Sequence, residues 1–344
     1  MSEYGGVEVL RLNPSLPDPV PADDEILIRI HATSVNPIDA VRRMGYGRRV
    51  FKLLGAKMPL ILGHDASGVV VKTGRNVTRF KAGDAVWIAP DAFRDGTYAE
   101  YVAVREREVA MKPQNLTHEE AASIPYVALT TWAALVGTGA IEPGKAAGKT
   151  VLVHAGSGGI GSFAIQLLKA WGANVATTCG PGNVEFCRSL GADRVIDYSR
   201  EDFAKELKDI DVVFDTLGYL AGVEKGSLRV LRRGAGAHYV SIVNPLLPWI
   251  DEGGFILGGA RVALTLLGMK IWMRLWKGAR YSWAHFSTSG AVLEEIRTLV
   301  EAGKVRPVVQ TVMDLSDVAK AHTAIESRRT RGKIVLHCLA ADAA

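Results

Sequence analysis

Short runs of alternating hydrophobic and polar residues fill the first 110 residues and predict β-strands. "EILIRIHA" (25–32) places its three isoleucines on one face and polar side chains on the other. "SGVVVKTG" (67–74) and "GDAVWIAP" (83–90) are rich in apolar residues and are bounded by Gly, Pro and Asp. We therefore expect a curled antiparallel β domain in this part of the chain.

Beyond about residue 117 the pattern changes to helical stretches that alternate with short apolar runs. The runs predicted as strands are "TVLVHAG" (150–156), "NVATTC" (174–179), "DRVIDY" (193–198), "DVVFDTL" (211–217) and "AHYVSIV" (237–243). Strands that alternate with helices predict a parallel sheet covered on both faces. Near the end, "SGAVLEEIRTLVEAG" (289–303) predicts a helix and "GKIVLHCL" (332–339) predicts a final strand.

Residues 255–277, "FILGGARVALTLLGMKIWMRLWK", form a long apolar stretch that four basic residues interrupt. Its longest uncharged run is far shorter than the ~20 residues of a transmembrane helix. On a helix Lys270, Arg274 and Lys277 share one face, roughly opposite two tryptophans. Two interpretations stay open. One is a basic amphipathic helix on a membrane surface; the other, which we prefer, is a helix at a subunit interface or over the active site, with a solvated charged face.

The chain has 344 residues, of which 48% are hydrophobic and 22% are charged. This length and composition are those of a globular protein of roughly two domains. The net charge is +5, but no long basic run or nucleic-acid-reading motif is present, so we expect no nucleic-acid partner. The three cysteines fit neither a disulfide framework nor a paired-cysteine metal site, which favours a reducing compartment. With no apolar signal core at the N-terminus, we expect a cytoplasmic protein, or a mitochondrial matrix protein if a presequence has been removed.

The stretch "VLVHAGSGGIGSFAIQLLKAWGANV" (151–175) contains the spacing Gly156-x-Gly158-x-x-Gly161. A predicted strand leads into these glycines, an apolar-periodic helix follows them, and a second strand comes next. In this context the glycines permit a tight turn, close approach to a pyrophosphate and close packing of helix on strand. The helix N-terminus offers free N–H groups and a partial positive charge to the anion. We therefore predict a dinucleotide site.

The end of the second strand indicates which dinucleotide is bound. An NAD site carries Asp or Glu about 20 residues beyond the glycines, but no acidic residue occurs here from Asn174 until Glu185. An acid would repel a 2′-phosphate, so its absence permits NADP. The nearest candidates for holding that phosphate are Tyr198 and Arg200 in "DYSRED". We predict NADPH.

Several further motifs carry a family resemblance: "SVNPID" (34–39), "LGHDASGVV" (62–70), "RFKAGDAVW" (79–87), "GTYAEYVAV" (96–104), "AASIPYVALTTWAAL" (121–135), "LGADRVIDY" (190–198) and "RGKIVL" (331–336). In this order, and over nearly the whole chain, they resemble the quinone-oxidoreductase branch of the medium-chain dehydrogenase/reductase superfamily. "LWKGARYSWAHF" (275–286) and "EAGKVRPVV" (301–309) look most like the mitochondrial reticulon-4-interacting oxidoreductase group.

This resemblance implies an α/β fold of two domains. A GroES-like, β-rich catalytic domain would span residues 1–122 and be completed by 288–344. A Rossmann domain with a doubly wound parallel sheet would span 123–287 and bind NADPH. The implied activity is NADPH-dependent reduction of a quinone or an α,β-unsaturated carbonyl compound, a small-molecule substrate, and we expect a homodimer.

The superfamily includes zinc alcohol dehydrogenases, whose catalytic zinc needs three protein ligands. Against that pattern this sequence has Asn36 at the place of the first cysteine, keeps His64, and has "PYVAL" (125–129) near the third ligand. The four-cysteine structural lobe is missing as well. We therefore expect no metal, and we expect His64 to be a hydrogen-bonded core residue or a residue beside the cofactor.

Hydride transfer needs no protein nucleophile, because the cofactor carries the chemistry. The resemblance places the "SVNPID" loop at the nicotinamide, with Asn36 as a donor to the acceptor carbonyl. Tyr46 in "RMGYG" matches a tyrosine that donates a proton in related enoyl reductases, and an ordinary half-buried loop tyrosine is the alternative. Asp39 would orient a neighbour or cap the turn after Pro37.

The resemblance also implies a set of cofactor contacts. It assigns Ser157, Gly158, Gly159 and Ile160 to the pyrophosphate, and Gly180 and Tyr198 to the adenosine phosphate. Thr216 would contact the adenine-side ribose, and Ile242, Ala284 and Phe286 the nicotinamide. Arg329, Thr330 and Arg331 would form a basic tail that contacts the cofactor. Gly180 replaces a serine of the most similar group, which weakens the grip on a 2′-phosphate. A purely structural role is the alternative for each distal position.

Two other functions stay open beside the quinone or enone reductase. One is a dinucleotide-binding protein that acts mainly through protein partners. The other is an enoyl-thioester reductase, which needs a long apolar channel.

Overall fold

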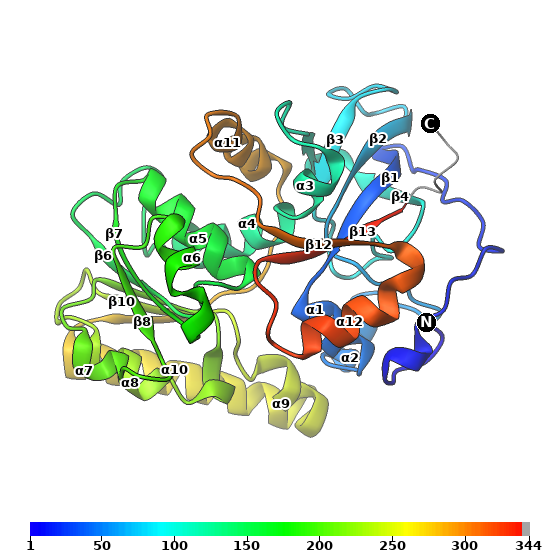
Figure 1. Cartoon of the computed structure of the whole chain (residues 1–344). Helices are drawn as coiled ribbons and strands as arrows, with labels where there is room; N and C mark the ends of the chain where they lie inside the picture. The colour runs from blue at the N-terminus through cyan, green and yellow to red at the C-terminus, as the bar shows by residue number, and fades with distance from the viewer. Residues whose placement is uncertain (339–344) are drawn as a thin grey trace. The chain divides into compact units, whose positions relative to one another are not determined.

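The computed structural model describes residues 1–338, which form two compact units (Figure 1). The first unit comprises Met1–Leu129, Ser287–Gly303 and residues 307–338, and the second comprises Thr130–Phe286 and Lys304–Arg306. Each unit is built around its own sheet. The first sheet is mostly antiparallel and the second is parallel, so the predicted α/β fold class is confirmed.

The first unit contains a seven-stranded sheet in the order β12-β13-β1-β2-β3-β5, with β4 paired to β1. Its strands are β1 (Glu25–Val35), β2 (Ala66–Thr73), β3 (Ala85–Ile88), β4 (Tyr101–Arg105), β5 (Val109–Met111), β12 (Val309–Asp314) and β13 (Lys333–His337). Neighbouring strands are antiparallel except β12 and β13. The predicted face of β1 is confirmed, because Ile26, Ile28 and Ile30 are buried together in the core of this sheet. Residue 339, the last of the predicted final strand, lies outside the described residues.

Six short helices accompany this sheet or continue from it. They are α1 (Pro37–Arg43), α2 (Arg48–Leu53), α3 (His118–Ala122), α4 (Pro125–Trp132), α11 (Gly290–Glu301) and α12 (Val318–Glu326). Single 3-10 turns lie at Val7–Val9, Glu106–Glu108, Pro181–Asn183, Gly218–Ala221 and Leu315–Asp317, and π-helical turns at Ala133–Gly137 and Gly254–Gly258. Helix α1 follows β1 directly, so the end of a buried strand fixes where this helix begins.

The second unit contains a six-stranded parallel sheet in the order β11-β10-β9-β6-β7-β8. Its strands are β6 (Thr150–Val153), β7 (Asn174–Cys179), β8 (Arg194–Asp197), β9 (Val212–Asp215), β10 (His238–Ser241) and β11 (Arg280–Trp283). Its helices are α5 (Gly159–Ala170), α6 (Val184–Ser189), α7 (Phe203–Glu206), α8 (Glu224–Val230), α9 (Leu246–Gly253) and α10 (Gly259–Lys277). The central strands β6 and β9 are almost entirely buried, as expected where helices cover both faces. The strand order reverses between them, because the chain runs from β6 out to β8 and returns to β9 on the other side.

The segment 255–277 departs from its predicted arrangement. A π-helical turn, Gly254–Gly258, joins α9 to α10, which begins only at Gly259. The predicted charged face is wrong for Lys277, which is buried with its ammonium group on the carbonyl oxygens of Arg229 and Leu231. These carbonyls lie at the C-terminal end of α8, where backbone acceptors lack partners within the helix and attract a cation.

By length and composition, the continuous helical path Leu246–Lys277 is the one described segment long and apolar enough to cross a membrane. Its most apolar 18-residue window has a mean hydropathy of 1.4, and only 6% of that window is buried inside the structure. The same criterion is met by core helices of soluble proteins, but those are mostly buried. The apolar surface of this segment therefore faces outward.

Candidate functional site

Most of the residues predicted to contact a dinucleotide, all but the basic tail 329–331, lie at one edge of the parallel sheet. The residues that follow the strand ends are Gly180 after β7, Tyr198 after β8, Thr216 after β9, Ile242 after β10 and Ala284 after β11, besides the glycine loop after β6. All six strands run parallel, so their carboxyl ends meet at the same edge. The crevice at such an edge, where the strand order reverses, is where open α/β sheets bind their ligands.

At two positions of the glycine loop there is no room for any residue larger than glycine. A Cβ atom on Gly161 would lie 2.2 Å from the carbonyl oxygen of Ala155, and one on Gly156 would lie 2.1 Å from Oγ1 of Thr177. Ala155 itself has a φ of 53°, the left-handed conformation that costs a non-glycine residue energy. The loop is therefore held in a tight turn that brings the start of α5 against β6 and β7.

Helix α5 begins at this loop and has Gly158 as its N-cap, which offers no side chain to cap the first turn. The first backbone N–H groups of a helix have no partners within it. At Gly158 an added Cβ would make only an ordinary contact of 3.4 Å, so this glycine leaves open space in front of the helix. Ser157, Gly159 and Ile160 are half-buried beside it. These residues fit the pyrophosphate of a dinucleotide.

Gly180 and Tyr198 are brought together by the pairing of β7 with β8. A Cβ on Gly180 would lie 3.2 Å from the hydroxyl oxygen of Tyr198, whose side chain is 68% exposed. The position directly after β7, where an NAD site has its acid, is therefore occupied by a glycine beside an exposed tyrosine hydroxyl. Arg200 is exposed in the same loop as Tyr198.

The other half of the sheet edge is organised by Asp215, a residue that the sequence did not single out. Its Oδ1 accepts hydrogen bonds of 2.9 Å from the N–H groups of Leu217 and Gly218, and its Oδ2 accepts one of 2.5 Å from the hydroxyl of Tyr239. Burial and the neighbouring Asp215 carboxylate raise the pKa of Tyr239, so that its hydroxyl stays protonated and donates. Asp215 thus shapes the turn that carries Thr216.

The remaining residues of this edge are placed by backbone pairing. Thr216 donates its Oγ1 hydrogen to the carbonyl oxygen of His154, at 2.7 Å. The N–H of Ile242 donates to the Asp215 carbonyl, and that of Ala284 to the Ser241 carbonyl. Phe286, half-buried, follows two residues after Ala284.

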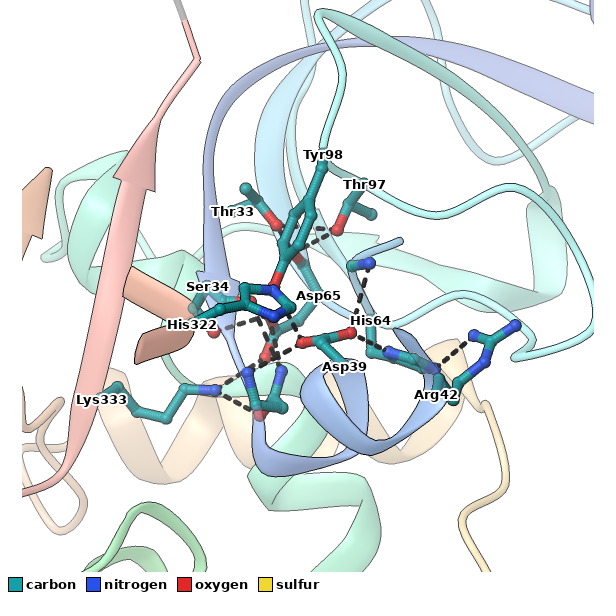
Figure 2. Close-up of polar contacts among 12 residues, drawn as sticks. Thr33, Ser34, Asp39, Arg42, His64, Asp65, Thr97, Tyr98, His322 and Lys333 are labelled. Carbon is teal, nitrogen blue, oxygen red and sulfur yellow. Dashed lines mark hydrogen bonds and ion pairs between the residues drawn. The ribbon is translucent and has the colours of Figure 1, made fainter. Parts of the chain in front are cut away.

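The first unit contains a chain of buried polar side chains around α1 (Figure 2). Asp39 is fully buried, and each of its carboxylate oxygens accepts two hydrogen bonds. Oδ1 accepts from the N–H of Gly63 at 3.2 Å and from Nδ1 of His64 at 2.5 Å. Oδ2 accepts from the N–H of Asn36 at 2.8 Å and from the hydroxyl of Tyr98 at 3.0 Å. Asp39 therefore caps α1 and also orients a neighbour, the two roles that the sequence left open.

The hydrogen bonds of His64 define its protonation. Nε2 of the ring lies 2.8 Å from Nη1 of Arg42, and a guanidinium group can only donate. Nε2 is therefore the acceptor, so the ring is neutral and carries its proton on Nδ1, where it donates to Asp39. The prediction of a hydrogen-bonded core histidine is confirmed.

His64 consequently offers no lone pair to a metal. Both of its ring nitrogens are engaged, and one of them faces the cation of Arg42. Throughout residues 1–338, no group of three or more His, Cys, Asp and Glu side chains is arranged to hold a metal ion. The donor set around His64 therefore does not fit a tetrahedral zinc, which needs three protein ligands and one open position.

Lys333 forms a second group of buried polar contacts, next to those of Asp39. Its ammonium group donates to Oδ1 of Asn36 and lies 3.4 Å from Oδ2 of Asp65 (Figure 2). Asp65 also accepts a hydrogen bond of 2.6 Å from the Ser34 hydroxyl. The side-chain nitrogen of Asn36 makes only long contacts, 3.5 Å to the Ser34 carbonyl and 3.4 Å to Asp65. The carboxamide of Asn36 is thus oriented with its oxygen on Lys333 and its N–H groups loosely held.

Tyr46 lies half-buried in the turn between α1 and α2, only a few residues beyond the Asp39–His64–Arg42 chain. Its N–H donates to the carbonyl of Val41. The predicted basic tail, Arg329, Thr330 and Arg331, lies in the first unit between α12 and β13, where Arg329 and Arg331 are exposed. The roles of Asn36, Tyr46 and this tail toward a substrate or cofactor stay predictions.

Two families match this chain. The alcohol dehydrogenase GroES-like domain matches residues 22–114, and the zinc-binding dehydrogenase family matches residues 190–336. The chain is 41% identical over 350 residues to the mitochondrial NAD(P)H oxidoreductase RTN4IP1 of Mus musculus, covering 98% of this chain and 88% of that protein. It is 33% identical over 348 residues to the 2-methylene-furan-3-one reductase of Solanum lycopersicum, covering 98% and 77%. The quinone oxidoreductase structure from Coxiella burnetii superposes with a TM-score of 0.80 at 28% identity, covering 98% of both chains.

A GroES-like domain joined to a Rossmann-like domain for a nicotinamide dinucleotide defines a class of two-domain oxidoreductases. This chain belongs to the medium-chain dehydrogenase/reductase superfamily, close to its RTN4IP1 group. The resemblance drawn from its motifs is confirmed.

Proposed function

We propose that this protein transfers hydride from NADPH to a quinone or an α,β-unsaturated carbonyl compound, without zinc. The observation that carries the proposal is the sheet edge of the second unit. There a glycine cradle precedes the N-terminus of α5, and Gly180 stands where NAD sites have an acid. The donor set around His64 supports a mechanism without metal.

A reduced nicotinamide, when bound, supplies the hydride; the chain's own residues bind, orient and donate protons. In this proposal the residues at the start of α5 hold the pyrophosphate, and Ile242, Ala284 and Phe286 flank the nicotinamide and exclude water. Negative charge that grows on the acceptor oxygen is met by an N–H of Asn36, and the Tyr46 hydroxyl delivers the one proton that completes the reduction. The buried chain of Asp39, His64 and Arg42 keeps α1, and thereby Tyr46, in place.

The names of the relatives support the class of acceptor. The Coxiella protein is described as a quinone oxidoreductase and the tomato enzyme as a 2-methylene-furan-3-one reductase. A quinone and a 2-methylene ketone share an electrophilic carbon conjugated with a carbonyl group. One hydride and one proton reduce either of them.

The direct test is oxidation of NADPH by the purified protein with a panel of acceptors: a naphthoquinone, a simple enone and an enoyl thioester. We expect turnover with the quinone or the enone. Turnover with the enoyl thioester alone would replace the proposed acceptor. Tight NADPH binding without turnover on any of the three would instead favour a protein that acts through partners.

We further propose that the protein works as a homodimer in a reducing compartment, the bacterial cytoplasm or the mitochondrial matrix. Cys179, Cys187 and Cys338 are free and buried, which fits such a compartment. The RTN4IP1 relative is described as mitochondrial.

Replacing Gly180 by Asp tests the choice of cofactor. The new carboxylate after β7 would repel a 2′-phosphate and accept a hydrogen bond from a ribose 2′-hydroxyl. We expect the KM for NADPH to rise at least about tenfold while that for NADH stays the same or falls. The matched control is Gly180→Asn, which adds the same bulk beside Tyr198 without the charge. Equal losses in the two variants would attribute the effect to bulk.

Replacing Tyr46 by Phe tests the proton donor. Loss of a general acid lowers the rate typically by about 10²–10⁴-fold. We therefore expect kcat to fall by at least about a hundredfold, with NADPH affinity unchanged by fluorescence titration. Since a quinone product can be protonated by water, the loss is expected to be larger for the enone than for the quinone. An unchanged kcat for the enone would leave Tyr46 a structural residue.

A further inference from the structure

The outward face of α10 carries a stripe of exposed apolar side chains. Leu264, Leu267, Ile271 and Leu275 are 71%, 56%, 50% and 82% exposed. Their spacing of three and four residues aligns them along one side of the helix. Single exposed apolar residues are ordinary, but a contiguous apolar surface of this kind marks a binding surface.

The opposite face of the same helix is already packed. Met273 is completely buried in the core of the second unit, and Leu266 and Met269 pack against that core. Lys277 anchors the end of the helix to the carbonyls at the end of α8. Helix α10 is therefore apolar on two opposite sides, and only one of them is used within the second unit. A helix that is apolar all round is typical of a protein core or a membrane environment.

The exposed apolar surface continues into the turn before α10 and includes two tryptophans near the C-terminal end of α10. In the π-helical turn that precedes it, Phe255, Ile256 and Leu257 are 47%, 83% and 74% exposed. Near its C-terminal end Trp272 and Trp276 stack on one another, with ring centroids 4.5 Å apart, and remain partly exposed. Figure 1 shows α9 and α10 as consecutive parts of one long helical path along the second unit. Tryptophans at the border of an apolar helix surface are typical of membrane interfaces.

The charges around this surface identify its partner. Lys270 and Arg274 are exposed beside the apolar stripe, whereas Arg261 lies 3.9 Å from Glu252. The sequence has no Asp or Glu from residue 253 to residue 293. A second copy of the chain packed on α10 by twofold symmetry would present the same basic residues, and neither α10 nor the turn before it has an acid to pair them. Anionic lipid headgroups provide the missing negative charge.

We propose that α10 and the preceding π-helical turn dock the protein on the surface of an anionic lipid bilayer. The apolar stripe lies at the boundary between headgroups and acyl chains, and Lys270 and Arg274 reach the headgroups. The helix lies on the membrane and does not cross it, because its inner face is held in the core of the second unit. This inference does not rest on the proposed acceptor, since docking needs no turnover.

The test is flotation of the full chain with vesicles of phosphatidylcholine that contain phosphatidylglycerol. The double variant Leu264→Gln/Leu275→Gln removes apolar area at two highly exposed positions. We expect it to bind at least about tenfold more weakly than the wild type. The matched control is Leu12→Gln/Val20→Gln, which changes two residues of the first unit that are 56% and 82% exposed. This control is expected to bind like the wild type.

A second variant tests the charge. Lys270→Gln/Arg274→Gln is expected to weaken binding to the anionic vesicles roughly 10- to 30-fold and to have little effect with pure phosphatidylcholine. Binding of the wild type is also expected to fall with added salt.

Three outcomes would overturn the proposal. The first is a wild type that fails to float with anionic vesicles, and the second is a Leu264/Leu275 variant that floats as well as its control. The third is a dimer, seen by light scattering, that this variant converts to a monomer, with no vesicle binding by the wild type. The surface would then be an interface between copies of this chain. Circular dichroism of each variant checks that it is folded, as expected for changes at exposed positions.

Discussion

Gly161→Ala is expected to weaken NADPH binding at least about a hundredfold while the rest of the second unit keeps its structure. The added Cβ would lie 2.2 Å from the carbonyl oxygen of Ala155 and 2.8 Å from the Cα of Gly156. Both are backbone atoms of the loop, so no side-chain rotation relieves the clash. The turn itself must move away from the start of α5.

The size of the effect follows from the hydrogen bonds that this movement removes. A hydrogen bond to a charged group contributes about 1.5–3 kcal/mol. Loss of two such bonds between backbone N–H groups and a pyrophosphate weakens binding at least about a hundredfold. Isothermal titration with NADPH measures the loss directly. A dissociation constant within about threefold of the wild type would contradict the assignment of this loop to the cofactor.

Substitutions at two further glycines distinguish a loss of NADPH binding from a loss of folding. Gly268 lies on α10 with open space around its Cα, so Gly268→Ala is expected to leave NADPH binding unchanged. Gly158→Ala adds a methyl group that makes only an ordinary contact with the protein, at the N-cap of α5. We expect it to weaken NADPH binding without lowering the free energy of unfolding, because only the ligand approaches this position closely.

The parallel sheet of the second unit could be predicted because its signals are local. Each of the five strands predicted for it is a short run of mostly buried residues, and the structure contains all five. Strand β11, "RYSW", was not predicted, because its four residues do not form an apolar run and it becomes a strand only by pairing with β10. Strand β12 was missed for a similar reason, since it alternates between half-buried and exposed residues beside β13.

The buried polar side chains around Asp39 in the first unit make contacts that local sequence patterns do not predict. Asp39 and His64 were both noticed, yet their 2.5 Å contact joins residues 25 positions apart in the sequence. Lys333 contacts Asn36 across 297 positions of the sequence, and its only signal was a charged residue directly before three apolar strand residues. The exposure of Lys277 was mispredicted. Helical periodicity shows on which face of a helix a residue lies, but it does not show which parts of the chain pack against that face.

Asp39→Asn is expected to lower the free energy of unfolding of the first unit by about 3–5 kcal/mol at neutral pH. Both oxygens of the carboxylate accept from two donors, and three of the four donors belong to the buried residues Asn36, Gly63 and His64. An asparagine has a single side-chain oxygen, so its NH₂ group must face two of these donors in either orientation. Urea unfolding of the two proteins measures the difference.

The matched control for this substitution is an exposed ion pair. Asp317 lies 2.7 Å from Lys320 on the surface of the first unit, and Lys320 is 77% exposed. Exposed pairs of this kind contribute at most about 1 kcal/mol. Asp317→Asn is therefore expected to change stability only slightly. A loss for Asp39→Asn no larger than this would show that the buried chain does not stabilise α1.

The pH dependence of the same variant tests the charge of Asp39. Burial raises the pKa of this carboxyl group, but the His64 ring and the surrounding donors outweigh burial and lower the pKa to about 2. The unfolded chain has the ordinary value of 3.8, so it binds the proton first as the pH falls. The contribution of Asp39 is therefore complete above about pH 5 and disappears as the pH approaches about 2.

The stability difference between the wild type and Asp39→Asn should follow this titration. A shift of this size corresponds to about 2 kcal/mol, by which the difference is expected to shrink between pH 5 and pH 2. Groups that do not interact with Asp39 titrate alike in both proteins and cancel in the comparison to a first approximation. A difference that stays constant over the range would mean that the four donors, and not the negative charge, account for what Asp39 contributes.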